Sequence, residues 1–337
     1  MHIPDGYLSP ETCAVMAAAS APFLVRASNE VQKRFHRVSL PMVGVFGAFS
    51  FLVMMLNLPL PGGTTGHAVG TVLASIVLGP WLSMIAVSLA LVIQALFFGD
   101  GGILAIGANI FNMAIVMSWV GYGLFHLLGI LTRNRWSAPA RAGIAGYVAI
   151  NVAALATGIE LGLQPLLFKN TAGHALYFPY PLVVSVPAML LGHLVIAGFA
   201  EAIISSFGYA WLLKQYPGLI EAGKRESAGS MRAIFLALSL IIFIVPLGLL
   251  APGTAWGEWS RQELGAMKLG YIPSGFDRMS TFWTAPLSGY NATVVHNPAL
   301  GYVISALVGV VLILGVFIFV EKLATKSKPP AHTGKSS

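Results

Sequence analysis

Long apolar runs separated by short polar segments dominate the hydrophobic pattern of this 337-residue chain. A run of about 20 apolar residues is long enough to cross a bilayer as a helix, which pairs its own backbone amides in hydrocarbon. We identify nine runs, at 10–28, 39–57, 66–79, 81–98, 104–130, 142–162, 182–213, 232–251 and 300–320. The pattern therefore predicts an all-α integral membrane protein, a bundle of about nine transmembrane helices.

The third and fourth runs are shorter than the others, and only Gly79 and Pro80 separate them. Two short apolar runs in succession are typical of two crossings, but also of a helical hairpin that enters the membrane without crossing it fully. The sequence leaves both arrangements open.

The basic residues indicate how the spans are oriented. Fifteen of the 19 Lys and Arg residues follow the first, fifth, seventh and ninth runs, and the other four are Lys169, Arg261, Lys268 and Arg278. Because loops rich in Lys and Arg stay in the cytoplasm, nine crossings predict an N-terminus outside and a C-terminus in the cytoplasm of a plasma-membrane protein. This bias also explains the net charge of +7, so no nucleic-acid partner is expected.

A polar stretch rich in glycine, containing Pro217, divides the chain and is typical of a linker. We expect a transmembrane domain, a cytoplasmic linker, two further helices around an outer loop, and a disordered tail, at 1–215, 216–231, 232–321 and 322–337. The outer loop, 252–299, holds Trp256, Trp259 and Trp283, which favours an ordered element over a flexible tether.

The chain opens with MHIPDGYLSP, which lacks the basic region and cleavage site of a secretory signal, so we expect Met1 to remain its first residue. Pro4, Asp5 and Gly6 predict a turn that folds the preceding residues back over the bundle. Ser9, followed by Pro10 and an acidic residue, predicts the start of a helix.

A histidine at position 2 is well placed to chelate a metal with the chain end. The α-amine of Met1, the deprotonated amide nitrogen of His2 and its imidazole Nδ1 form fused five- and six-membered rings around one ion. Such planar nitrogen ligation suits Ni²⁺ or Cu²⁺, with Co²⁺ in a relaxed geometry. Since the nitrogens must lose their protons, affinity should fall as the pH drops. The single cysteine, Cys13, excludes a cysteine-based metal cluster.

His67 is the candidate for the fourth nitrogen, because the predicted topology places it on the same outer face as His2. Thr64 or Thr65 could cap the third helix and bring His67 into its first turn. A metal-bound histidine normally donates its other ring N–H to an acceptor. The candidates for that role are Asp5, Gln94, Asn109 and Asn112. Spacing alone does not decide between this site and two structural histidines.

Other buried polar and small residues carry weaker signals. Glu201 lies within the seventh run, where an ionisable group indicates function, but it fits either a contact with a partner subunit or a link between helices. Ala14 and Ala18 form a small-xxx-small pair that lets a partner helix, or one of the same bundle, approach closely. We interpret His126 and His193 as structural.

The opening MHIPDGYLSP, the GGTTGHAVG segment around His67, the QALFFGDGGILAIGANIFNMA stretch and the AEAII segment at Glu201 together resemble a known family. They are similar to the cobalt/nickel substrate-capture subunits of energy-coupling-factor transporters, the CbiM/NikM-like proteins, over residues 1 to about 215. The resemblance implies a bundle with its N-terminal segment inserted from outside, and Met1, His2 and His67 as nitrogen ligands.

The resemblance also implies partners, namely a membrane coupling subunit and two ATP-binding cassette ATPases. The chain has no GxxxxGK[ST] loop, so it cannot supply the ATP site itself. In layout, the region 232–321 looks like the small accessory subunit, CbiN/NikN-like, that often accompanies these transporters, here fused in line. No catalytic residue and no prosthetic group is predicted; Co²⁺ or Ni²⁺ is the cargo.

Two other functions stay as alternatives. An autonomous secondary carrier or channel is disfavoured because the sequence has no internal repeat. An intramembrane metalloenzyme is disfavoured because no HExxH pair is present and Glu201 has no histidine at ligand spacing. The sequence does not discriminate cobalt from nickel, and it leaves the oligomeric state of the complex open.

Overall fold

A computed structural model describes the chain except for residues 35–39, 219–231, 252, 268, 293–294 and 327–337. The first part forms α1 (Pro10–Arg34), α2 (Leu40–Met54), β1 (Leu58–Leu60), β2 (Thr64–Gly66), α3 (Thr71–Leu78), α4 (Pro80–Ile93), η1 (Gln94–Phe98), α5 (Ile106–Asn109), η2 (Ile110–Val116), α6 (Met117–Leu131), α7 (Ala138–Leu167), α8 (Leu182–Gly192), η3 (His193–Ala197) and α9 (Gly198–Gln215). The remainder forms α11 (Arg232–Ile244), η4 (Val245–Leu250), α12 (Arg261–Ala266), α13 (Ser274–Met279), η5 (Ser288–Tyr290) and α14 (Pro298–Lys326).

Within the described ranges, six helical segments are long and apolar enough to cross a membrane. They are Pro80–Phe98, Ile106–Leu131, Ala138–Leu167, Leu182–Gln215, Arg232–Leu250 and Pro298–Leu323. The prediction of an all-α membrane protein is confirmed, whereas the count of nine spans and the orientation of the termini stay predictions.

The other three predicted spans form helices that do not meet these criteria, each for its own reason. α1 has 25 residues, but several charged residues near its C-terminal end lower its apolar character. α2 has 15 residues, about 22 Å, and α3 has 8, about 12 Å, against a hydrocarbon core of roughly 30 Å. α3 is therefore too short to cross on its own, in keeping with the hairpin alternative.

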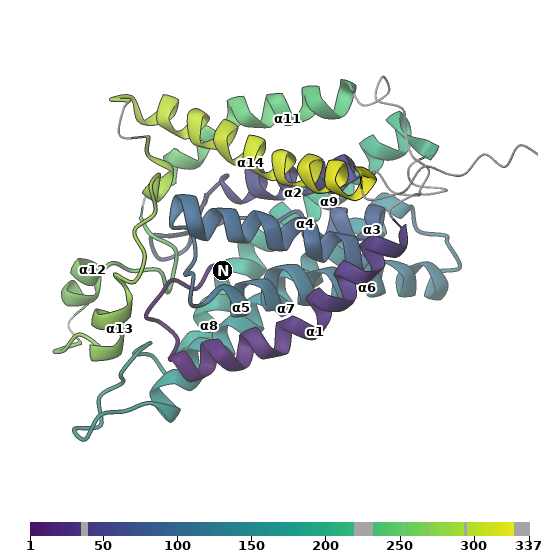
Figure 1. The fold of residues 1–337 in the computed structure, drawn as a ribbon. Coiled ribbons are helices and arrows are strands. Elements are labelled where there is room, and N and C mark those ends of the chain that lie inside the picture. Colours follow the sequence, from purple (N-terminus) through teal and green to yellow (C-terminus); the bar gives the residue numbers. More distant parts are fainter. Residues whose placement is uncertain (35–39, 219–231, 252, 268, 293–294, 327–337) are drawn as a thin grey trace, which may run out of the picture.

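α2 is the most enclosed helix, and it packs between α4 and α14 (Figure 1). It is apolar around its whole circumference, as a helix surrounded by others should be. On the other side of the bundle, α7 packs against α6, α8 and α9. α1 approaches α5 so closely that a Cβ on Gly107 would lie 2.6 Å from the Ala17 Cα, so a larger residue at Gly107 would separate these two helices.

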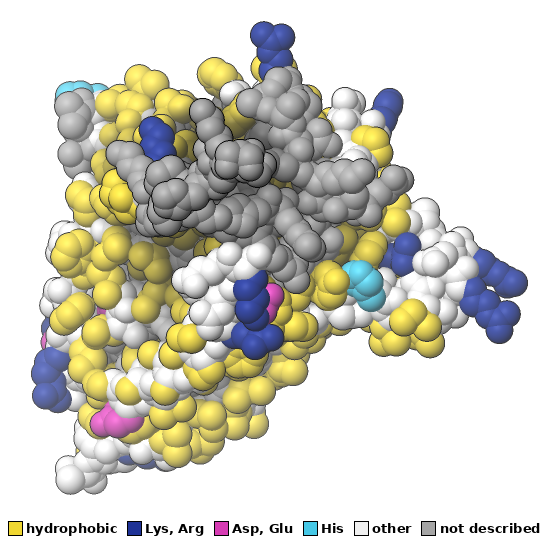
Figure 2. Space-filling view, turned by 45° about the vertical axis from the view of Figure 1, so that its right-hand side comes forward, with side chains coloured by type: hydrophobic (Ala, Val, Ile, Leu, Met, Phe, Trp, Pro, Cys, Tyr) yellow, Lys and Arg dark blue, Asp and Glu magenta, His cyan; other side chains and the backbone are white. Residues whose placement is uncertain are grey.

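Large apolar side chains are exposed over much of the surface, and Figure 2 shows them covering wide parts of one described face. The most exposed include Val183, Phe207, Phe243 and Leu250, each with 72% or more of its surface accessible. An apolar surface of this extent is far beyond what a soluble monomer carries and is the one that lipid requires.

Segments from distant parts of the chain gather at one end of the molecule, where α12 and α13 lie (Figure 1). There the N-terminal segment, the loop before α8 and the predicted outer loop share a small apolar core. It includes Ile3, Tyr7, Phe178, Trp259 and Phe276. The described part of the 252–299 loop is thus an ordered element, as its tryptophans predicted.

Two of the predicted domain boundaries lie near the ends of helices in the structure. α9 ends at Gln215, where the linker was expected to begin, although most of that linker lies outside the described residues. The tail was expected from residue 322, but α14 continues to Lys326 because its helical pattern persists through that segment. Residues 327–337 lie outside the described part.

Candidate metal centre

The first residues of the chain lie inside the bundle rather than on its surface (Figure 1). Met1, His2 and Ile3 have 4%, 3% and 0% of their surfaces exposed. The Asn109 side chain accepts a hydrogen bond from the Ile3 N–H at 2.8 Å and donates one to the Ile3 carbonyl at 3.1 Å. This carboxamide therefore fixes the backbone immediately after the two expected ligands.

The predicted turn at Asp5 and Gly6 is present, with Gly6 at a φ of +90°, a conformation that favours glycine. The Asp5 carboxylate accepts from the N–H groups of Ile103 and Leu104 at 3.1 and 2.8 Å. Its described hydrogen bonds thus anchor the turn to the loop before α5 and reach neither histidine. Ser9 caps α1, accepting from the backbone N–H three residues on at 3.1 Å, as predicted.

The structure brings His2 and His67 together. The Nε2 atom of His67 lies 3.2 Å from the Nδ1 atom of His2, and both rings are buried. The other nitrogen of His67, Nδ1, lies 3.0 Å from the Ala68 carbonyl oxygen, which can only accept. In a neutral ring, Nδ1 then carries the proton, and the Nε2 lone pair is left facing His2.

The backbone after His67 is held by Glu201 from α9. One carboxyl oxygen of Glu201 accepts from the N–H groups of Val69 and Gly70 at 2.7 and 2.9 Å. Glu201 has 0% of its surface exposed, so in this structure its carboxyl group faces the bundle interior rather than a partner subunit. Glu201 therefore holds the backbone two and three residues after His67 and so limits where His67 can lie.

The expected capping of the third helix is wrong. Thr64 and Thr65 belong to β2, which pairs antiparallel with β1, and α3 begins only at Thr71. Gly70, at a φ of 75°, precedes the helix, so His67 lies in the irregular segment between strand and helix. Thr64 and Thr65 instead lie in the hairpin, and Glu201 accepts from the N–H groups of Val69 and Gly70 just before α3.

Replacing Glu201 with alanine should weaken metal binding although Glu201 contacts neither histidine by a hydrogen bond. Two buried N–H groups would lose their acceptor, and the segment that carries His67 would relax. We expect the affinity for Ni²⁺ to fall by about 10- to 100-fold, as when partners of metal ligands are removed. Calorimetry on Glu201→Ala and on Glu201→Gln, which keeps an acceptor oxygen, tests this; equal affinity in Glu201→Ala and the wild type contradicts it.

Asp100 is one of two acidic residues at the site, and it lies beside His2. Its Oδ1 is 3.0 Å from the Nδ1 of His2. Its Oδ2 accepts from the Tyr290 hydroxyl at 2.5 Å and from the Gln94 amide at 3.2 Å, and Gln94 also donates to the Tyr290 oxygen at 2.9 Å. Gln94 therefore orients Asp100, the carboxylate beside His2.

The second acidic group is Glu258, whose carboxylate lies 3.8 Å from the amine of Met1. Burial raises the pKa of Glu258, while the Met1 ammonium opposes that rise. Burial, assisted by the same ammonium charge, lowers the pKa of His2 to about 3. The His2 ring is therefore neutral at physiological pH, so binding a metal through Nδ1 requires transfer of the ring proton to Nε2 but no net loss of a proton from the ring.

Sequence reasoning missed Asp100, Glu258 and Tyr290. One signal was present for Asp100, because the chain has only 12 acidic residues and this one stands among glycines in a stretch that carries the family resemblance. No comparable signal marked the other two, which lie more than 250 residues from Met1 in sequence. They reach the site only through the tertiary packing of the outer loop.

The remaining predicted residues lie elsewhere. Asn112 donates to Glu160 at 2.8 Å and to Thr157 at 3.1 Å, so it belongs to a separate polar cluster with α7. Ala14 and Ala18 are exposed on α1 and are available to another helix.

The candidate donors are the nitrogens of the two imidazoles and of the chain end. Among the described residues, no three side chains of His, Cys, Asp or Glu are grouped closely enough to hold a metal by themselves. Two nitrogens bound to one ion at about 2.0 Å each lie about 2.8 Å apart when adjacent in a square plane. The 3.2 Å between His67 and His2 needs an adjustment of only a few tenths of an ångström.

Known proteins are similar to this chain in sequence and in fold. Residues 2–219 match the sequence family described as the cobalt uptake substrate-specific transmembrane region, and residues 230–326 match the PDGLE domain. A fused nickel transport protein NikMN of Rhodobacter capsulatus is 45% identical over 93% of this chain and 95% of its own length. The probable fused nickel transport protein LarMN of Lactiplantibacillus plantarum is 41% identical over the same shares.

A cobalt transport protein CbiM of Streptomyces coelicolor is 35% identical over 48% of this chain and 70% of its own. The crystal structure of a truncated transition metal transporter, 53% identical, superimposes with a TM-score of 0.61 over 64% of this chain and 99% of that one. Fold and site thus define a multi-pass membrane protein of transition-metal transport. The chain belongs to the cobalt-uptake substrate-specific family, in the fused layout that continues into a PDGLE domain.

Proposed function

We propose that this chain is the substrate-capture subunit of an ATP-driven importer in the plasma membrane, and that it binds Ni²⁺ or Co²⁺ through Met1, His2 and His67. The observation that carries the proposal is the approach of the His67 Nε2 to the His2 Nδ1, 3.2 Å, beside the buried chain end. The amine of Met1 and the amide nitrogen of His2 complete a set of four nitrogens.

The acidic residues support this proposal because a divalent ion in a buried site needs nearby negative charge. Binding through a deprotonated amide leaves one positive charge on the complex. Asp100 and Glu258 already lie beside His2 and the amine of Met1, so the site offers the charge without rearranging distant groups. Glu258 comes from the PDGLE domain, which gives that domain a role in completing the site.

Nickel is the cargo we favour. Four nitrogens in a plane suit Ni²⁺ better than Co²⁺. The two relatives that share the fused layout over nearly their whole length are named as nickel transport proteins. Competition between the two ions, followed by calorimetry on protein without an N-terminal tag, tests this preference.

Energy for import must come from partner proteins, because the sequence has no phosphate-binding loop for ATP. We propose a membrane coupling subunit and two ATP-binding cassette ATPases. When this chain is reconstituted in liposomes with these partners, we expect ATP-dependent accumulation of radioactive nickel, and none with the chain alone. Accumulation by the isolated chain without ATPases would show an autonomous carrier and would contradict the importer.

A further inference from the structure

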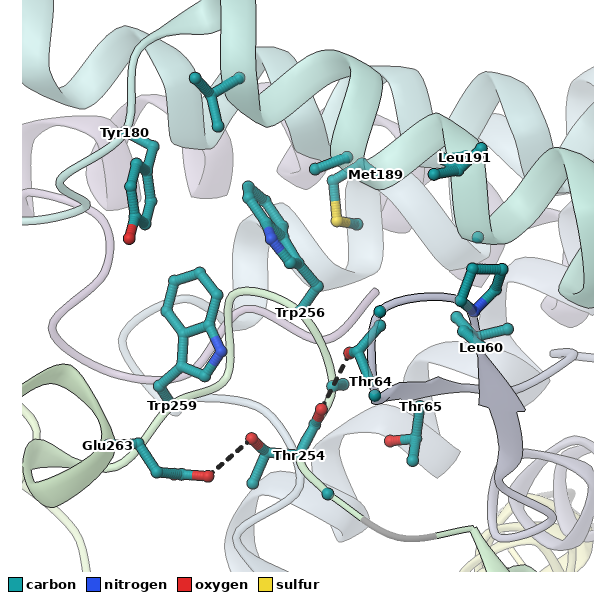
Figure 3. Close-up of a pocket in the computed structure, with 18 of the residues that line it drawn as sticks. Leu60, Thr64, Thr65, Tyr180, Met189, Leu191, Thr254, Trp256, Trp259 and Glu263 are labelled. Atoms are coloured by element: carbon teal, nitrogen blue, oxygen red, sulfur yellow. Dashed lines mark hydrogen bonds between the residues drawn. The ribbon is translucent and has the colours of Figure 1, made fainter. Parts of the chain in front are cut away.

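A cavity of about 820 Å³ lies beside the N-terminus, and Met1 is one of the residues that line it. The wall is formed by the β1–β2 hairpin, by α8 and by the segment that carries Trp256 and Trp259 (Figure 3). A divalent ion with six bound waters occupies about 180 Å³, at roughly 30 Å³ per water molecule. The cavity is therefore large enough for a hydrated ion to reach the N-terminal nitrogens and exchange its waters.

Two hydrogen bonds, one between the two domains and one within the PDGLE domain, shape one side of this cavity (Figure 3). The Thr64 hydroxyl donates to the Thr254 carbonyl at 2.9 Å, and the Thr254 hydroxyl donates to Glu263 at 2.9 Å. Glu263 thus presents a carboxylate in the cavity wall, where it attracts cations from the outer solution.

His193 also lines the cavity, and its ring has one nitrogen without a partner. Nδ1 lies 2.7 Å from the Met189 carbonyl oxygen, so in the neutral ring it carries the proton and donates it there. Nε2 then holds a lone pair, is buried and has no hydrogen-bond partner, while only 4% of the residue is exposed. Buried polar atoms are almost always paired, so an unpaired one on a residue that lines a cavity points to a ligand.

The place of His193 in the fold supports the same interpretation. It begins η3, a π-helical segment, and such segments are frequent at functional sites. His193 lies eleven residues after Leu182, where α8 begins, and this spacing corresponds to about 16 Å along the helix. Met1 lines the same cavity, so the cavity connects His193 with the chain end of the candidate metal centre.

We propose that His193 is a transient ligand that takes the divalent ion from the cavity and passes it to the nitrogens of Met1, His2 and His67. The proposal rests on the function proposed above. A single imidazole with waters holds a divalent ion weakly, whereas four nitrogens hold it tightly, so transfer runs toward the N-terminus. A weak site on the route is what passage requires, since the ion must both enter and leave it.

The variant His193→Asn tests this, because its side-chain amide keeps a donor for the Met189 carbonyl and removes Nε2. An intermediate site lowers the activation barrier for binding of the ion at the N-terminal nitrogens and for its release from them. Its loss should therefore slow Ni²⁺ association and dissociation by the same factor, about tenfold, and leave the Kd unchanged. Stopped-flow fluorescence measures both rates, with the tryptophans of the cavity wall as reporters.

His126 offers a matched control. Its Nδ1 also lies near the carbonyl four residues earlier, at 2.8 Å from the Tyr122 oxygen, but it is exposed on α6. We expect His126→Asn to bind Ni²⁺ at the wild-type rate. A His193→Asn variant with wild-type rates, or with a changed Kd and an unchanged association rate, overturns the transient site. Absence of binding in the wild type would instead refute the proposed function.

A second measurement tests directly whether a divalent ion binds at His193. In a chain carrying His67→Ala and an N-terminal extension, millimolar Co²⁺ should quench the fluorescence of Trp256 and Trp259, which line the cavity. Adding His193→Asn to that chain should remove the saturable part of the quenching. Equal saturable quenching in both chains contradicts binding at His193.

Discussion

We expect an extension of one or two residues before Met1 to abolish tight binding of Ni²⁺, and the same residues added after Ser337 to leave it unchanged. The extension turns the amine into an amide whose lone pair is delocalised, which removes one of the four nitrogens. It also adds atoms where Met1 has only 4% of its surface exposed and its nitrogen lies 3.8 Å from Glu258. Calorimetry on purified protein in detergent measures the loss.

Proton release gives this result an independent check. The pKa of His2 is about 3 in the folded chain, so this ring is already neutral at pH 7 and releases no proton when it binds. Protons released at that pH then come from the amine and the amide, about two for each metal ion. Affinity falls as the pH drops because protons compete for these nitrogens. Titrations in buffers of different ionisation enthalpy give the count.

If almost no protons were released for each metal ion, only the imidazoles would bind the metal, and the chain end would not be a ligand. Tight binding by the extended chain would lead to the same conclusion. Removing the extension with a protease that restores a free Met1 should recover both the affinity and the proton release, which separates loss of the amine from damage to the fold.

Local patterns in the sequence were sufficient to predict the N-terminal segment. The turn at Gly6 and the cap at Ser9 depend on residues within a few positions of each other, so short-range rules apply. The approach of His2 to His67 follows from topology, since both were expected at the outer end of the bundle. The helical class follows from apolar length alone.

The parts that could not be predicted all depend on contacts between distant residues. Asp100 reaches His2, and Tyr290 reaches Asp100 across 190 positions. Glu201 lies 132 positions from Val69, and which segment it supports could not be read from the sequence, which left both a partner contact and a link between helices open. No periodicity or motif encodes such pairs, because they are set by how whole helices and loops pack.

The PDGLE domain shows how such contacts join the two parts of the chain. The Tyr7 hydroxyl donates to the Trp259 carbonyl at 2.6 Å, and the Tyr7 ring packs against Phe178 and Phe276. The outer loop of this domain therefore covers the turn that directs Met1 into the bundle. This packing explains why a region with its own two helices contributes Glu258 and Tyr290 to the candidate metal centre.

The second large effect is expected from His67→Ala, which removes the only proposed ligand outside the N-terminal segment. Loss of groups that merely support a metal ligand costs about 10- to 100-fold in affinity, so loss of the ligand itself should cost at least about 100-fold. The remaining three nitrogens would still chelate, so we expect weak binding with the proton release retained. Calorimetry measures both quantities in one titration.

His174 is the matched control for this variant, since it is exposed in the loop before α8 and stacks on Tyr271 with ring centroids 4.3 Å apart. His174→Ala should bind Ni²⁺ with wild-type affinity. If His67→Ala also bound with wild-type affinity, the fourth nitrogen would have to come from elsewhere. A chain that lost affinity together with proton release would instead show that His67 is needed to hold the chain end in place, because the amine and amide would no longer reach the ion.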